Sequence, residues 1–358
     1  MNILEQIYEI NFNKINFLER KISIKDNRTI LIGPPKSGKS YLIFDYLSNF
    51  DENKYLYIDF EDYKNDFIQI EKNLDTFIEK NNIQVVVFEN FKFNLDLPKV
   101  TNIIISTKEN KTLDGFSKLQ VKALDFEEFL LFDAKHQNIS QNFNSFLKFG
   151  SFPEIIEFTE SKKANRNYEI CKLFCKDNIE LEIFFILVKN SGEKKSIYQL
   201  FSILKKSIKI SKDRFYKTCE EYEQNGIIYF CQKYEQQKAV KKLFVFNHAL
   251  LDIVSYKKNF NNLFKNMIYL ELIKRQKEVY YLDNVDFYIP KDQIIILVIP
   301  FFNNLISSTI ISKVLPYIQK YKVKDISIVT VNGEQNIYIG DIEAKILPFY
   351  DWVLSIEE

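Results

Sequence analysis

The sequence is poor in the residues that usually interrupt helices and strands. Its 358 residues include only 8 glycines and 8 prolines, although glycine alone averages about 7% in globular proteins. Long apolar runs are missing as well: the longest, residues 294–302, contains Pro300 and falls far short of the roughly 20 residues that a membrane span needs. We therefore expect no membrane partner. Because residues 1–5 do not read as a signal peptide, we expect a soluble, cytoplasmic protein.

Cysteine and histidine are also scarce, which limits the metal chemistry open to the chain. The two histidines are His136 and His248, and the four cysteines form no tight C-x-x-C pair: Cys171, Cys175, Cys219 and Cys231. Cys171 and Cys175 would share one face of a helix, but a zinc site needs more ligands nearby. We expect buried thiols in a reducing compartment.

Charge is nearly balanced overall, at a net +1, but it is unevenly placed. Residues 1–160 hold 19 basic and 25 acidic side chains, residues 161–260 hold 20 and 11, and residues 261–358 hold 10 and 12. The middle of the chain therefore carries a net +9 between segments of −6 and −2. A basic middle segment favours an anionic partner there.

Two of the few glycines fall in a motif with a defined chemistry. The spacing G-x-x-x-x-G-K-[ST] is met by Gly33, Gly38, Lys39 and Ser40. An aliphatic run, residues 29–32, precedes the motif and a helix-compatible run follows it, so the expected order is strand, loop, helix. That context predicts a P-loop rather than a glycine-rich turn with an incidental Lys-Ser.

Each part of a P-loop has a physical task on a bound nucleotide. Glycine permits backbone conformations that turn N–H groups inward as an anion-binding nest, and the following helix adds the positive end of its dipole. Lys39 is expected to reach the β- and γ-phosphates, and the Ser40 hydroxyl to bind Mg²⁺. We therefore expect ATP and Mg²⁺ as cofactors, with the nucleotide held by nine consecutive residues: Gly33, Pro34, Pro35, Lys36, Ser37, Gly38, Lys39, Ser40 and Tyr41.

Apolar runs alternate with helical patterns through the first part of the chain. Strands are expected over residues 54–60, 83–90 and 100–106, with a helix over 66–80. The continuously apolar run at 83–90 is typical of a strand that is covered on both faces. The alternation predicts an α/β fold, namely a P-loop NTPase domain with a parallel sheet.

The carboxylate near the end of the apolar strand at 83–90 is the candidate partner of the P-loop. In P-loop NTPases an acid at the end of an apolar strand holds Mg²⁺, and Glu89 is placed for that role; the alternative is a solvated strand-end acid. Asn90 follows, where a second acid usually polarises the attacking water. An amide can orient a water but cannot take its proton. With Glu89 and Asn90 as the catalytic pair, we expect slow hydrolysis.

Further candidates follow the other strands. Ser106 or Thr107 could sense the γ-phosphate, and Glu61 and Asp62 could approach the same site. Only five arginines occur in the chain, and none closely follows Ser106. No arginine finger is therefore evident, and Lys118 is the one cation expected to stand in for it.

Three later segments carry a resemblance to a known family. They read Leu-Asp-Phe-Glu-Glu-Phe-Leu at 124–130, Phe-Leu-Lys-Phe-Gly-Ser-Phe-Pro-Glu at 146–154 and Ile-Leu-Pro-Phe-Tyr-Asp-Trp-Val-Leu at 346–354. Together with the P-loop they resemble, over nearly the whole chain, a family of AAA-superfamily ATPases found in bacteria and archaea. The resemblance implies an ATPase core, a winged helix and a C-terminal domain of restriction-endonuclease-like fold. That family usually has Asp-Glu at positions 89–90 and an arginine near Phe116, and this chain has neither.

The middle of the chain has the element order of a winged helix. A helix at 212–224 is followed by a strand at 227–231, a polar wing at 232–241 and a return strand at 242–246. The second helix of such a module can lie in the DNA major groove, which makes residues 205–245 a candidate site for DNA or a protein partner. Several basic side chains could contact phosphate there: Lys212, Arg214, Lys217, Lys238, Lys241 and Lys242. The alternative is a packing or lid role, because the same helix carries acids that would repel DNA: Glu220, Glu221 and Glu223.

The C-terminal part keeps little of a nuclease site. A helix at 262–276 carries Glu271, and Asp286 matches the first strand acid that the resemblance implies. The next strand, at 296–300, lacks the expected acid-x-Lys pair, and metal-dependent hydrolysis needs such groups. We expect a nuclease-like scaffold without nuclease activity, used for packing or partner binding.

The chain is long enough for two or three domains. We expect a P-loop ATPase core at 1–135, a helical and winged-helix region at 136–260, and a degenerate α/β nuclease-like domain at 261–358. The expected function is that of an ATP-binding ATPase with slow turnover, in which the nucleotide acts as a conformational switch between the domains. The alternative is a winged-helix regulator that binds DNA or a partner and keeps its nucleotide for structural reasons. An oligomer is possible on either interpretation.

Overall fold

The computed structural model of the chain describes residues 3–9, 12, 15, 18–133, 138–173 and 175–356, without the side chains of 304–307. His136 and the domain boundary predicted at 135–136 lie outside these residues. The chain divides into two compact units. The first comprises Met1–Lys122 and Gln224–Gly226, and the second comprises Ala123–Glu223 and Ile227–Glu358.

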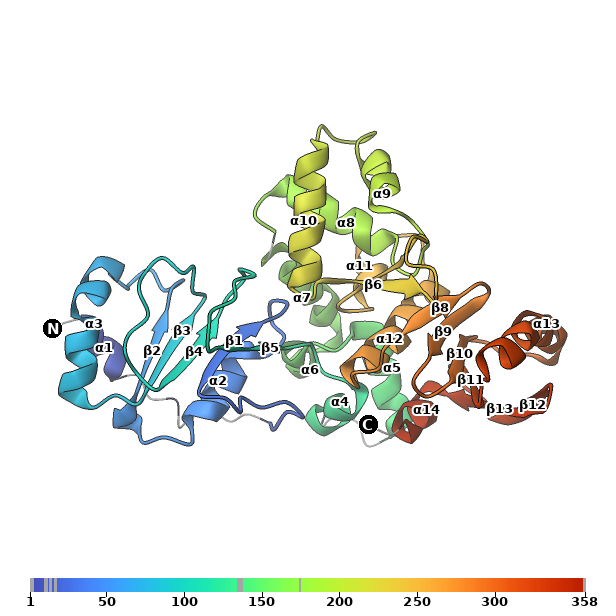
Figure 1. The fold of residues 1–358 in the computed structure, drawn as a ribbon, viewed down its shortest axis with the longest axis horizontal. Helices are drawn as coiled ribbons and strands as arrows, with labels where there is room; N and C mark the ends of the chain where they lie inside the picture. Colours follow the sequence, from blue (N-terminus) through green and yellow to red (C-terminus); the bar gives the residue numbers. More distant parts are fainter. Residues whose placement is uncertain are drawn as a thin grey trace. The chain divides into compact units, whose positions relative to one another are not determined.

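The first unit is built on a five-stranded sheet in which every pairing is parallel (Figure 1). In pairing order its strands are β2 (Tyr55–Asp59), β3 (Val85–Glu89), β4 (Asn102–Ser106), β1 (Arg28–Ile32) and β5 (Ser117–Gln120). The prediction of an α/β fold with a parallel sheet is confirmed for this unit. Because the strands are parallel, the P-loop after β1 and the acid that ends β3 emerge at the same edge, with β4 between them.

Side chains alternate between the two faces of this sheet, and each face has its own helical cover. Leu31 packs in a core with α2 (Lys39–Leu47), whereas its neighbours Ile30 and Ile32 pack with α1 (Ile3–Tyr8) and α3 (Phe67–Asn81). All five residues of β3 are buried, which explains why that strand reads as an uninterrupted apolar run. A short 3₁₀ helix, η1 (Glu52–Lys54), leads into β2.

The second unit contains an eight-stranded mixed sheet. In pairing order its strands are β12 (Gln335–Ile339), β13 (Ile342–Pro348), β11 (Asp325–Thr330), β10 (Ile294–Val298), β9 (Val285–Ile289), β8 (Tyr280–Leu282), β6 (Ile228–Lys233) and β7 (Lys242–Val245). The β13–β11, β11–β10 and β8–β6 pairs are parallel and the others antiparallel.

Helices cover both faces of this second sheet. Phe264 and Met267 of α12 (Phe260–Lys274) pack on one face together with α14 (Phe349–Ser355), and Ile310 and Val314 of α13 (Asn304–Tyr321) pack on the other. The remaining helices of the unit come earlier in the chain: α4 (Phe126–Phe132), α5 (Ile139–Phe149), α6 (Pro153–Glu157), α7 (Glu160–Leu173), α8 (Asn178–Lys189), α9 (Ile197–Leu204), α10 (Lys212–Gln224) and α11 (Leu250–Val254).

The segment predicted to be the wing, residues 232–241, begins within strand β6 and ends next to strand β7 of this sheet. Gln232 and Lys233 belong to β6 and pair with Tyr280 and Tyr281 of β8, so the strand continues past the point where the wing was expected to begin. Lys242, expected to contact phosphate, is only 6% exposed. The sequence could not indicate this, because the alternation along a short strand does not say which face another element will cover.

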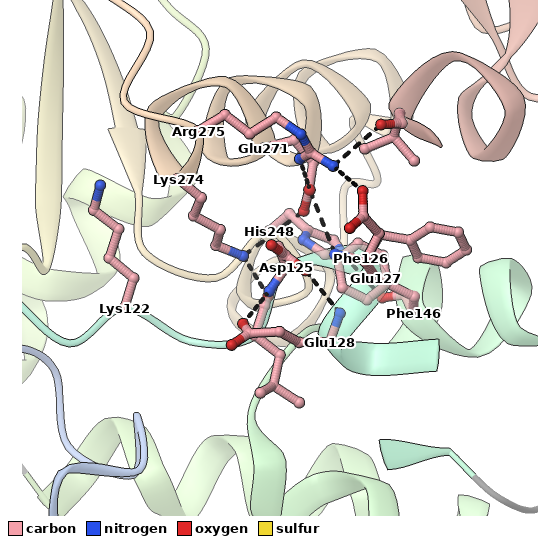
Figure 2. A network of polar contacts seen from close by, with 12 residues as sticks. Lys122, Asp125, Phe126, Glu127, Glu128, Phe146, His248, Glu271, Lys274 and Arg275 are labelled. Carbon is pink, nitrogen blue, oxygen red and sulfur yellow. Dashed lines mark hydrogen bonds and ion pairs between the residues drawn. The ribbon is translucent and has the colours of Figure 1, made fainter. Parts of the chain in front are cut away.

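Glu271 belongs to a buried ion network that is shown in Figure 2. Its carboxylate accepts hydrogen bonds from Arg275 at 2.9 Å and from the backbone N–H of Phe126 at 3.4 Å, with the Lys274 ammonium 3.7 Å away. Arg275 also donates to Glu127 at 2.7 Å, which joins α12 to the first turn of α4. Burial raises the pKa of Glu271, and the charge of Lys274 opposes that rise. A carboxylate committed to these partners serves packing rather than hydrolysis.

The thiols have the surroundings expected of inert cysteines. Cys171, Cys219 and Cys231 are buried and unpaired, and burial raises the pKa of the Cys171 thiol to about 12. Helix α7 ends at Leu173, so Cys175 lies beyond it and does not continue the helix face of Cys171 as expected. Among the described residues, no helix is both long enough and apolar enough to cross a lipid bilayer.

Candidate nucleotide site

The loop between β1 and α2 requires glycine at its first position. Gly33 has a φ of +144°, and a Cβ there would lie 2.2 Å from the carbonyl oxygen of Val121, which follows β5. Lys36 and Gly38 also have positive φ, at 61° and 98°, and Ser37 stands between them. Alternation of left-handed and right-handed residues turns successive N–H groups toward one side, which makes a concave site for an anion.

In the part of the chain that the structure describes, no side chain caps the N-terminus of α2. Gly38 is the N-cap and makes no capping hydrogen bond, whereas the N-cap of α3, Asp66, accepts from two backbone N–H groups. The first-turn donors of α2 therefore remain available to a ligand, and the helix dipole favours a negative one. Tyr41, in that first turn, is 53% exposed.

The side chain of Lys39 bends back toward the P-loop and binds its backbone. Its ammonium donates to the carbonyl oxygens of Gly33 at 2.9 Å and Pro34 at 2.8 Å. Burial lowers the pKa of Lys39 to about 8, the carboxylate of Glu89 opposes that shift, and the charge of Lys108 adds to it. Among the described residues no carboxylate contacts the Lys39 ammonium directly, so an incoming phosphate would supply a counter-charge.

A polar lead-in segment precedes β1, and its Arg20 holds the P-loop in place. Arg20 donates to the carbonyl oxygen of Ser37 at 3.0 Å and to that of Lys122 at 3.1 Å. It thereby links the middle of the P-loop to the segment after β5. Sequence reasoning did not find Arg20, because the lead-in has no periodic pattern that would indicate where its side chains lie.

Glu89 lies at the carboxyl end of β3 and faces the P-loop helix. The Ser40 hydroxyl donates to one carboxylate oxygen, and the hydroxyl of Tyr57, from β2, donates to the other. Glu89 is 6% exposed. Burial raises its pKa, while the hydrogen bond from Ser40 and the charge of Lys39 lower it. Tyr57 was not foreseen, because it reaches Glu89 only through the β2–β3 pairing.

Asn90 continues directly from Glu89 in a left-handed conformation, with a φ of 56°. Its side-chain amide donates to the carboxylate of Asp59 at 2.9 Å. Asp59 ends β2 and pairs in register with Glu89. The carboxylate next to Asn90 therefore belongs to Asp59, and it accepts the hydrogen bond of the Asn90 amide.

The strand-end hydroxyls differ in what they do. Ser106 and Thr107 are both buried, and the Thr107 hydroxyl donates to the carbonyl oxygen of Phe91 at 2.7 Å. This bond commits Thr107 to holding the segment after β3. Ser106, the last residue of β4, is the one whose hydroxyl is left as the candidate for sensing phosphate.

The cation near the loop is not the one expected. Lys118 pairs with Ile30 in the sheet, three residues before Gly33, and its ammonium donates to Asn110 at 2.8 Å. Lys108, which follows β4, acts electrostatically on Lys39 and forms an ion pair with Glu61 at 2.8 Å. Lys108, rather than Lys118, is therefore the candidate cation beside Lys39.

The two acids that the nuclease resemblance would combine belong to different networks. Glu271 is bound by Arg275 and Lys274, as described above. Asp286 instead contacts the ammonium of Lys265 at 2.7 Å and accepts from the backbone N–H of Val298 at 2.9 Å. Among the described residues, no group of three or more His, Cys, Asp or Glu side chains is placed to hold a metal ion.

The groups around the P-loop fit a nucleotide bound with Mg²⁺. Mg²⁺ is usually held by one or two carboxylates together with substrate phosphates, and Ser40 and Glu89 supply two oxygen ligands of the right kind. The hydroxyl of Ser37 is buried without a hydrogen-bond partner among the described residues, which marks a polar atom in the loop that a ligand could satisfy.

Comparison with known proteins gives the following similarities. No protein-family model matches the chain. The uncharacterized protein MJ1544 of Methanocaldococcus jannaschii is 24% identical over 415 residues, covering 96% of this chain and 92% of the relative. Among solved structures, the Walker-type ATPase PABY2304 of Pyrococcus abyssi is similar with a TM-score of 0.43 and 12% identity, over 64% of this chain and 91% of that one. Likeness of this degree does not by itself establish a shared fold.

Proposed function

We propose that the chain binds ATP with Mg²⁺ at the P-loop and hydrolyses it slowly. The observation that carries the proposal is the contact between Ser40 and Glu89 beside the uncapped N-terminus of α2. It brings a hydroxyl, a carboxylate and free backbone donors to one place, and Lys39 lies next to them with a lowered pKa. Phosphate and a divalent cation together satisfy all of these groups.

On this proposal each residue has a defined part. The loop amides and Lys39 hold the phosphates, while Ser40 and Glu89 hold Mg²⁺, which neutralises charge on the phosphate oxygens. The hydroxyl of Tyr57 orients the Glu89 carboxylate by donating to the oxygen that Ser40 does not bind. Asn90 orients a water but cannot take its proton, so the step that activates the water is slow.

Binding would also change the partners of several groups, which is why we propose a switch. Lys39 would leave the carbonyl oxygens of Gly33 and Pro34 for phosphate, and Ser40 would exchange its bond to Glu89 for the metal. Exchange of partners at the loop is the kind of local event that biases a larger conformational equilibrium.

Binding of labelled ATP to the full chain tests the proposal. We expect Lys39→Ala to abolish binding and Lys72→Ala, an exposed residue of α3 outside the loop, to leave it nearly unchanged. Thermal unfolding of both variants checks that they fold. Equal ATP binding by the wild type and the Lys39→Ala variant would show that the loop is not the nucleotide site.

A regulator that binds DNA through the middle of the chain is a second proposal, favoured by one observation. Helices α8, α9 and α10 are followed by the antiparallel pair β6–β7, and Lys194 adds an antiparallel bridge to β7, which is a winged-helix order of elements. Lys212 and Lys217 of α10 are exposed, whereas Arg214 is bound to Asp177. Duplex DNA binding that weakens steeply with salt and is lost in Lys212→Ala with Lys217→Ala would support this proposal, and unchanged binding in that double variant would refute it.

A further inference from the structure

A cavity of about 580 Å³ lies within the second unit, apart from the P-loop. It is bordered by Gly192–Lys194, β7, α12, α13 and the β8–β9 and β10 strands. A pocket of this volume suits a small organic ligand, since such sites typically measure roughly 300–1,000 Å³. Its lining divides into a charged wall and an apolar wall.

The charged wall holds an excess of lysine. Four lysines line the cavity, Lys194, Lys242, Lys265 and Lys313, against two acids, Glu193 and Asp286. The ion pairs of Asp283, which is outside the lining, do not change this balance. Asp283 binds Lys194 of the lining and also Lys233 outside it, so the additional acid and the additional lysine cancel. The net charge of the lining is therefore +2.

Two of these ammonium groups share a single carboxylate. Lys265 contacts Asp286 at 2.7 Å, whereas Lys242 lies 4.0 Å from the same carboxylate and donates to the backbone carbonyl of Asp286 at 3.2 Å. The side chains of Lys242 and Lys265 are only 8% and 20% exposed. Burial lowers the pKa of Lys242 to about 8, and Asp286 opposes that shift. A second buried cation without its own anion is costly.

The second acid of the lining does not supply that anion. Glu193 accepts a hydrogen bond from the side-chain amide of Asn262 at 2.7 Å, which fixes its carboxylate at the edge of the wall. No ion pair of Glu193 with Lys242 or Lys265 is present among the described residues. A dianionic group in the cavity would balance the net charge of +2 that the lining carries.

The opposite wall is apolar and suits the remainder of a ligand. It is formed by aliphatic side chains from the β8–β10 strands and α13: Leu282, Val285, Leu297, Ile299, Ile310 and Val314. A free inorganic anion would leave this surface in contact with water only. A ligand with a flat or apolar part would bury it.

We propose that this cavity binds a phosphate monoester on an organic group of nucleotide size, with its phosphate between Lys242 and Lys265. A phosphate monoester carries a charge of about −1.5 to −2 at neutral pH, which matches the charge of the lining. Lysine binds phosphate as a point charge and does not need the fixed geometry of arginine. Asp286 holds Lys265 in position rather than a metal ion.

The test uses the full chain with Lys39→Ala, so that the P-loop contributes nothing, and calorimetric titration with AMP and with adenosine. We expect AMP to bind and adenosine to bind at least about tenfold more weakly, because adenosine lacks the charged phosphate that the two lysines would bind. Adding Lys265→Gln or Lys242→Met should weaken AMP binding by about tenfold or more. Adding Lys345→Gln, an exposed residue of β13 outside the cavity, should not.

A 5′-phosphorylated oligonucleotide and its 5′-hydroxyl counterpart separate the two sources of such a phosphate. If AMP binds, the ligand is a free nucleotide; if only the phosphorylated strand binds, it is a nucleic-acid end, and both results support the proposal. Thermal unfolding confirms that each variant folds, and Lys265→Gln serves if the more buried Lys242→Met does not. Absence of binding by all phosphorylated probes, equal binding of AMP and adenosine, or binding unchanged by Lys265→Gln would overturn it.

Discussion

The hydroxyl of Ser40 donates a hydrogen bond to the carboxylate of Glu89, although the two residues are 49 positions apart. The contact exists because β1 and β3 are parallel members of one sheet and end at the same edge. It joins the residue expected to bind Mg²⁺ from the P-loop to the acid expected to bind it from β3. The slow ATP hydrolysis proposed for this chain follows from the residues around Ser40 and Glu89, above all Asn90.

Asn90 and Asp59 offer a direct test of why hydrolysis should be slow. Exchanging them, with Asp59→Asn and Asn90→Asp, keeps a hydrogen bond between amide and carboxylate but moves the carboxylate to position 90. We expect hydrolysis to rise roughly tenfold or more, because a well-placed general base contributes about 10²–10⁴-fold. Aspartate, like asparagine, tolerates the left-handed backbone at this position. Single-turnover hydrolysis of labelled ATP measures the change.

Asp59→Asn alone is the matched control for that exchange. It removes one carboxylate without placing another at position 90, so its rate should not exceed that of the wild type. If the exchange variant binds ATP but hydrolyses it at the wild-type rate, the amide of Asn90 is not what limits turnover.

Tyr57→Phe should weaken binding of the metal more than binding of the nucleotide. The lost hydroxyl no longer orients or stabilises the ionised Glu89 carboxylate. Removal of such a supporting hydrogen bond typically costs roughly tenfold or more in metal affinity. We expect the Mg²⁺ concentration needed for half-maximal ATP binding to rise by about that factor, with metal-free ADP binding unchanged. Tyr55→Phe, two residues earlier on β2, should behave like the wild type, and an equal effect of both variants would exclude a specific role for Tyr57.

Lys108→Ala should lower the rate of ATP hydrolysis below that of the wild type. Lys108 is the cation whose charge reaches Lys39, and a cation there can stabilise the charge that develops on the transferred phosphate. We expect the single-turnover rate to fall roughly tenfold or more, with ADP binding changed little. Lys118→Ala, whose ammonium binds Asn110, provides the comparison. A larger loss of rate in Lys118→Ala than in Lys108→Ala would restore the assignment made from the sequence.

His248 should make the second unit sensitive to acid. Its ring is 1% exposed and its Nε2 donates to the carbonyl of Phe146 at 2.8 Å. Burial lowers its pKa from 6.5 to about 3, so below pH 6.5 the unfolded chain takes up a proton that the folded chain does not. Stability from this group is present above pH 6.5 and is lost as the pH falls, by up to about 1.4 kcal/mol per pH unit.

His248→Gln isolates that contribution. Glutamine can still donate to the Phe146 carbonyl but does not titrate. In urea unfolding at pH 7.5 and pH 5, we expect the wild type to lose more of its free energy of unfolding than the variant does. Parallel loss in the two proteins would show that His248 is not the group responsible.

The sequence predicted those features whose physical cause is local. The P-loop, the apolar run of β3 and the helix that became α3 each carry their own pattern of residues, and the structure has all three. Parallel pairing also followed from the alternation of strands and helices. Glu89 could be named as the candidate Mg²⁺ ligand because an acid that ends an apolar strand holds the metal in P-loop NTPases.

Other features depend on contacts between distant segments, which a single sequence does not display. Tyr57 meets Glu89 through strand pairing, and Arg20 reaches the loop from a lead-in without periodicity. Lys108 could not be recognised from the sequence, because the sequence does not show which residues after β4 lie near the P-loop. Lys242 was taken for a surface residue because nothing local reveals that Asp286 lies beside it.

Single-turnover hydrolysis tests the central claim most directly, because it measures binding and chemistry at one site. Excess protein is mixed with trace labelled ATP and Mg²⁺, and bound ATP and released phosphate are followed together. We predict that the ATP is bound and then hydrolysed at a rate on the order of 10⁻³ s⁻¹ or lower, as in P-loop proteins that lack an arginine finger, and that Lys39→Ala binds none. Hydrolysis near the enzyme median of about 10 s⁻¹, or no ATP bound by the wild type, would contradict the account.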